Sequence, residues 1–100
     1  MTKGKSNDAH PKTRAEVDKF IRQLTVETLM LDDIEPANID PNEQDFLIAL
    51  GANSIDALEL MISVEERLGF EFGDDELNPE MVATLDHFVS VICQKLGIAV

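Results

Sequence analysis

Hydrophobic residues recur at the three- and four-residue spacing of an α-helix in three separate stretches of the chain. The first stretch follows Thr-Arg-Ala-Glu at residues 13–16, whose hydroxyl and carboxylate can satisfy the free N–H groups at a helix start. This pattern predicts a helix over about residues 14–30. The second stretch predicts a helix that begins near Ser54, ends near Leu68 and is stopped by Gly69.

Two further helix starts lie close together near the carboxyl end of the chain. Asn78 followed by Pro79 is typical of an N-cap and a first helical residue, and it predicts a short helix over residues 79–82. Thr84 can cap a longer helix that Gly97 ends. The apolar stripe of that last helix contains Leu85, Phe88, Val89, Ile92 and Leu96.

A polar connection at residues 32–45 separates the first two long helices, and its two prolines interrupt any helix there. A connection this long in a small domain needs anchors in the core. The expected anchors are Ile34, Ile39, Phe46 and Leu47. Three longer helices, one short helix and no strand alternation predict an all-α fold, an irregular four-helix bundle with a long first loop.

The helix over residues 54–68 carries two apolar stripes when it is drawn as a wheel. The core stripe consists of Ala57, Leu60, Met61, Val64 and Leu68. The second stripe consists of Ile55, Leu58 and Ile62, and the acids around it are Asp56, Glu59, Glu65 and Glu66. Either another helix covers the second stripe, or it is a recognition surface in which the apolar residues give contact and the acids steer a partner.

Charge narrows the classes of partner. The net charge is −12, and only Arg67 and Lys95 are basic beyond residue 22. Such a surface repels nucleic-acid phosphates and anionic lipid and attracts partners with basic docking patches. We therefore expect no nucleic-acid binding and no membrane insertion. No apolar run is long enough to span a bilayer, no secretory signal is evident, and we expect a cytoplasmic monomer.

Few other residues suggest chemistry. Cys93 is the single cysteine, which excludes an intrachain disulfide and a cysteine-based zinc site, and we expect it to be a buried structural thiol. His87 is expected at the surface, the acidic loops lack the calcium-binding EF-hand pattern, and no metal site is predicted. No acid–base pair with a supporting third group can be assembled, so we expect no catalytic residues and no enzyme.

Ser54 stands at a helix start, where Ser or Asn is most often an N-cap. The helix dipole also favours a phosphate on an oxygen placed there. No histidine is evident beside it and no G-x-S-x-G elbow is present, so a self-activated nucleophile is not indicated. The residue suits a phosphodiester better than a catalytic role.

The segment Leu50–Leu60, LGANSIDALEL, closely resembles the L-G-x-D-S-[LI]-D-x-x-E-L signature of acyl carrier proteins, and the likeness extends over about residues 14–97. The resemblance implies that Ser54 carries 4′-phosphopantetheine, which a phosphopantetheinyl transferase adds from coenzyme A with magnesium. The thiol of the arm then holds an acyl group as a thioester, and the core stripe lines a cavity for the acyl chain. At position 53 this chain has Asn where the family usually has Asp, and this difference bears on which transferase can modify the protein.

We expect a disordered tail at residues 1–12 and a single carrier domain over residues 13–100. The resemblance also implies which partners the domain has and what role it plays. The partners are acyl-transferring, condensing or acyl-activating enzymes with basic patches, which contact Asn53, Ile55, Asp56, Leu58, Glu59, Ile62, Glu65 and Glu66. The expected function is a discrete acyl carrier for fatty-acid, polyketide or related specialised biosynthesis. The alternatives are an aminoacyl or peptidyl carrier of a nonribosomal pathway and an unmodified interaction module with the carrier fold.

Overall fold

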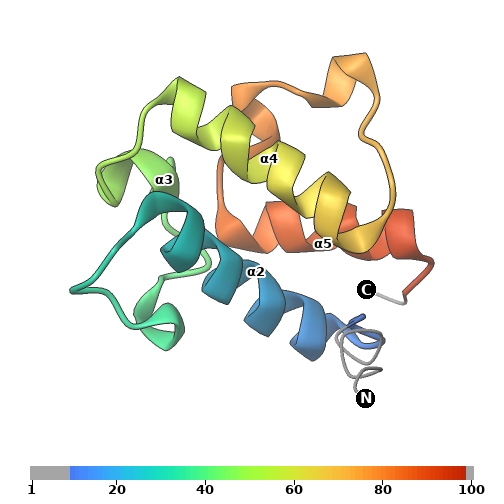
Figure 1. Cartoon of the computed structure of the whole chain (residues 1–100), viewed down its shortest axis with the longest axis horizontal. Coiled ribbons are helices and arrows are strands. Elements are labelled where there is room, and N and C mark those ends of the chain that lie inside the picture. The colour runs from blue at the N-terminus through green and yellow to red at the C-terminus, as the bar shows by residue number, and fades with distance from the viewer. Residues whose placement is uncertain (1–9, 99–100) are drawn as a thin grey trace.

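The computed structural model describes residues 10–98, and within that range the chain forms helices and no strand. The α-helices are α2 (Arg14–Leu29), α3 (Phe46–Ala49), α4 (Ser54–Leu68) and α5 (Leu85–Leu96). Short 3-10 helices span Pro36–Asn38, Asp74–Glu76 and Pro79–Val82. Helix α2 contacts both α4 and α5 (Figure 1). The all-α, irregular helical bundle predicted from the sequence is confirmed.

The start of α2 differs in detail from the predicted capping box. The Thr13 hydroxyl accepts the N–H of Glu16 at 3.2 Å, as expected. The Glu16 carboxylate accepts the N–H of Lys12 at 2.7 Å instead of that of Thr13. Residues 1–9 of the predicted tail lie outside the described residues, and Pro11 is buried. The backbone is therefore already held by contacts before α2 begins.

The ends of the long helices follow from left-handed backbone at the next residue. Gly69 and Gly97 have φ values of 75° and 73°, as glycine readily allows, and they end α4 and α5 as predicted. Helix α2 ends at Leu29, because Met30 adopts a φ of 54° and donates its N–H back to Glu27. The helix therefore has its predicted bounds to within one residue.

The long first connection is tied to α2 by one side chain. The Arg22 guanidinium donates to the carbonyl oxygens of Pro36 at 2.9 Å and Ile39 at 2.7 Å, and its Nε donates to Asp18. The predicted anchors also pack inward. Ile39, Phe46 and Leu47 are buried, and Ile34 is half-buried. A segment without local periodicity is thus fixed by tertiary contacts.

Helix α3 was not predicted, because its start depends on a distant contact. Asp45 precedes it in a left-handed conformation with a φ of 54°. The Asp45 N–H donates to the carbonyl of Ala83 at 2.6 Å, which links this start to the segment before α5. The predicted short helix at residues 79–82 has the expected bounds and the expected Asn78 cap, but it is a 3-10 helix.

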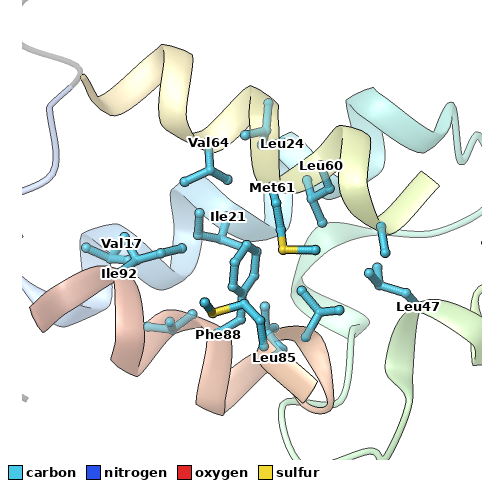
Figure 2. Close-up of a cluster of buried hydrophobic side chains, with 14 of the residues drawn as sticks. Val17, Ile21, Leu24, Leu47, Leu60, Met61, Val64, Leu85, Phe88 and Ile92 are labelled. Atoms are coloured by element: carbon cyan, nitrogen blue, oxygen red, sulfur yellow. The ribbon is translucent and has the colours of Figure 1, made fainter. Parts of the chain in front are cut away.

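Phe88 of α5 occupies the centre of the hydrophobic core. Its side chain is fully buried, and Figure 2 shows it between Ile21 of α2 and Met61 of α4. The Phe72 ring packs against it with centroids 6.2 Å apart. One aromatic side chain therefore joins the three long helices and the turn after α4.

The Asp74–Glu76 turn is fastened to α5 by a carboxylate. Glu76 accepts the N–H of Gly73 at 2.7 Å and pairs with the Lys95 ammonium at 2.6 Å. The hydrogen bond from Lys95 lowers the pKa of Glu76, and the Gly73 N–H lowers it further.

This lowered pKa predicts a pH dependence of stability. Glu76 stabilises the fold above its unfolded-state pKa, and the contribution is lost as the pH falls through its folded-state pKa. At neutral pH, the urea concentration at the unfolding midpoint should therefore be higher for the wild type than for Glu76→Gln. This difference between the two midpoints should disappear in acid. A difference that stays constant across this pH range would contradict the assignment, and Glu80→Gln, which changes an exposed carboxylate nearby, is the matched control.

Candidate functional site

The start of α4 is built by a reciprocal pair of hydrogen bonds. The Asn53 side chain accepts the N–H of Asp56 at 2.9 Å, and the Asp56 carboxylate accepts the N–H of Asn53 at 3.0 Å. Asn53 is therefore the N-cap, and Ser54 is the first residue of the helix. Among the described residues, none makes a hydrogen bond with the Ser54 hydroxyl within the protein. The Ser54 hydroxyl therefore takes no part in capping the helix, and Ser54 is exposed to solvent.

A cavity of about 500 Å³ opens beside Ser54. Its polar lining comes from Asp45, Asn53, Ser54 and Asn78. Its apolar lining comes from α3, from α4 and from the segment that leads to α5, and it comprises Ile48, Ile55, Ala57, Leu58, Met61, Leu77, Pro79 and Val82. A group attached to Ser54 would therefore stand at the edge of an apolar hollow.

The second stripe of α4 faces solvent. The exposed fractions of Ile55, Leu58 and Ile62 are 68%, 41% and 41%. The interpretation in which another helix covers this stripe is therefore wrong. Large apolar side chains that remain exposed together on one helix are a feature of interaction sites.

Comparison with known proteins decides the family. The family model for the phosphopantetheine attachment site matches residues 19–92, which include the whole of α4. The chain belongs to this family of carrier proteins. It is 38% identical over 72 residues to an acyl carrier protein of Zymomonas mobilis, covering 72% of this chain and 85% of that protein. It is 29% identical over 82 residues to an acyl carrier protein of Picosynechococcus, covering 82% and 94% respectively.

A carrier of this family bears a covalently attached 4′-phosphopantetheine, and the start of α4 fits such a group. The exposed Ser54 hydroxyl can be reached by another enzyme. The first turn of a helix offers free N–H groups and a positive dipole end to a phosphodiester. When bound, the arm supplies a thiol that forms thioesters. The Ser54 hydroxyl would hold the arm, next to the helix cap and the adjacent cavity.

The acids near the second stripe of the carrier fall into two groups. Glu59 and Glu66 are exposed. Asp56 takes part in the helix cap, and the Glu65 carboxylate accepts the N–H of Phe72 at 2.6 Å. Glu65 therefore holds the turn after α4, a contact that helical spacing alone does not reveal. Two of the predicted recognition acids are thus also structural.

The cavity of the carrier is formed differently from the expectation that the resemblance gave. Of the core stripe, only Ala57 and Met61 line it. Leu60, Val64 and Leu68 are buried in the main core instead. The reason is that the cavity lies on the side of α4 that faces residues 77–82, whereas the rest of the stripe packs inside the bundle.

The remaining sequence candidates lie apart from Ser54. Cys93 is fully buried as predicted, and burial raises the pKa of its thiol. His87 is exposed on α5, as predicted. Within residues 10–98, no three His, Cys, Asp or Glu side chains are grouped so that they could hold a metal ion. In the same range, no helix combines the length and apolar character that crossing a bilayer requires.

Proposed function

We propose that this protein is an acyl carrier that holds acyl intermediates as thioesters on a phosphopantetheine arm at Ser54. The observation that carries the proposal is the placement of this serine. It is exposed at the first position of a 15-residue helix, its neighbour Asn53 supplies the cap, and an apolar cavity adjoins it. The serine is a passive anchor, because among the described residues no side chain hydrogen-bonds to its hydroxyl to activate it.

The chemistry of the arm therefore belongs to partner enzymes. A phosphopantetheinyl transferase forms the phosphodiester, and acyl-transferring, condensing or acyl-activating enzymes load and use the thioester. The second stripe and the exposed Glu59 and Glu66 support docking of such enzymes through apolar contact and basic side chains. We assign the recognition role to Asn53 and Ile55 beside the serine, and to Asp56, Leu58, Ile62 and Glu65 along the helix.

The cavity favours an acyl cargo over an aminoacyl cargo. Eight of its twelve lining residues are apolar, and Asp45 is the one lining residue with a carboxylate. An aliphatic chain that enters would leave water, which stabilises by about 25 cal/mol per Å² of buried apolar surface. A charged α-amino group would gain nothing from the apolar walls and would lose hydration. Fatty-acid or polyketide-type chemistry is therefore our choice over a nonribosomal pathway.

One experiment tests both the carrier role and the cargo class. The protein is incubated with coenzyme A and a broad-specificity phosphopantetheinyl transferase, and its intact mass should rise by one phosphopantetheine. The modified protein is then charged with a hydrocarbon acyl group or with an amino acid. Because cargo that binds only the folded state stabilises it, the acyl form should have the higher thermal midpoint. No mass gain would refute the carrier role, and a higher midpoint for the aminoacyl form would refute the cargo class.

A further inference from the structure

Two exposed isoleucines lie beside Ser54, although they belong to different helices. The exposed fractions of Ile48 on α3 and Ile55 on α4 are 69% and 68%. Both line the cavity that Ser54 also lines. Figure 1 shows α3 next to the amino-terminal end of α4. We propose that Ile48 and Ile55 together form the apolar contact through which the modifying transferase binds beside Ser54. This inference rests on the function proposed above.

Ile48 is held outward by the way α3 is fixed. Its two predecessors, Phe46 and Leu47, are buried with exposed fractions of 1% and 3%. The Leu47 carbonyl accepts the N–H of Ala52 at 2.8 Å, and the Asp45 N–H donates to Ala83. The helix is therefore anchored on both sides of Ile48. An apolar side chain held in water at a fixed position is ready to be buried by a partner at little further conformational cost.

The charges around the two isoleucines specify the kind of partner. The sequence has no Lys, Arg or His from residue 23 to residue 66, a range that includes α3 and all of α4 except its last two residues, Arg67 and Leu68. Asp45 lines the cavity, and Glu59 is exposed further along α4. A second copy of this chain or an anionic membrane would be repelled by such a face. The complementary occupant is an enzyme surface with an apolar hollow bordered by Lys or Arg.

The test compares substitutions of two apolar side chains that are both largely exposed. Ile48→Glu places a charge in the proposed contact, whereas Met30→Glu changes a residue that is 78% exposed and does not line the cavity. Neither should alter the circular dichroism spectrum or the thermal midpoint of the unmodified protein. With coenzyme A and the transferase, Ile48→Glu should lower kcat/KM by about tenfold or more, as burial of a key apolar contact predicts. Met30→Glu should leave kcat/KM unchanged.

The salt dependence of the rate separates apolar contact from charge. Ile48→Ala should lower kcat/KM by the same factor at low and high salt, whereas Glu66→Gln should reduce the salt dependence itself. Equal kcat/KM for Ile48→Glu and the wild type would overturn this inference and leave the proposed function standing. If the wild type gained no mass at all, the proposed function would fall and this inference with it.

Discussion

Ser54→Ala is expected to abolish the gain of phosphopantetheine completely, while the protein stays folded. Alanine lacks the hydroxyl that forms the phosphodiester. The cap of α4 is untouched, because Asn53 and Asp56 exchange the two capping hydrogen bonds without Ser54. A change at an exposed helical position away from such contacts alters the free energy of unfolding by no more than about 0.5 kcal/mol.

The matched control for this substitution is Ser63→Ala. Ser63 lies in the same helix and is half-buried, and it does not line the cavity beside Ser54. Intact-mass measurements after incubation with coenzyme A and transferase should show full modification of Ser63→Ala and none of Ser54→Ala. A Ser54→Ala protein that still gains the arm would show that the attachment point lies elsewhere.

Phe88→Ala is expected to cause the largest loss of stability, about 3–5 kcal/mol, because it removes a buried aromatic ring and leaves a cavity. The ring is fully buried among α2, α4 and α5 (Figure 2). A domain of this size has a total stability of only about 5–15 kcal/mol, so the variant should be close to unfolding. Loss of this contact would also loosen α4, which carries the candidate site.

Phe70→Ala provides the comparison for Phe88→Ala. Phe70 is half-buried at the edge of the core and packs edge-on against Phe72, with ring centroids 5.0 Å apart. Its truncation should therefore destabilise the protein less than that of Phe88. Urea denaturation followed by circular dichroism measures both. Equal losses for the two variants would contradict the central position of Phe88 in the core.

The helices with local start and stop signals were predictable from the sequence. Asn53 and Gly69 define α4, and Thr84 and Gly97 define α5, through contacts with residues only a few positions away. Helix α3 has no such local signals. Its start is held by the hydrogen bond from the Asp45 N–H to the Ala83 carbonyl, a contact with a residue far away in the sequence. The sequence signal for α3 is the apolar run after Asp45, which by itself indicates core anchors and not a helix.

The candidate site also has some features that the local sequence predicts and others that arise only from packing. The second stripe follows from the wheel of one helix, whereas Ser54 was singled out by its place at a helix start and by the resemblance of Leu50–Leu60 to the carrier signature. The cavity, the contact of Glu65 with Phe72 and the position of Ile48 beside Ser54 bring together several segments of the chain. No pattern within one segment encodes these contacts, and they appear only when the helices pack.

The attachment of the arm can be tested most directly by locating it on the chain. Because no Lys or Arg lies between Arg22 and Arg67, trypsin releases residues 23–67 as one peptide that holds two serines, Ser54 and Ser63. Fragmentation of this peptide from the modified protein assigns the added mass to one residue. We predict that all of the phosphopantetheine is found on Ser54. Its presence on Ser63, or outside this peptide, would contradict the central claim.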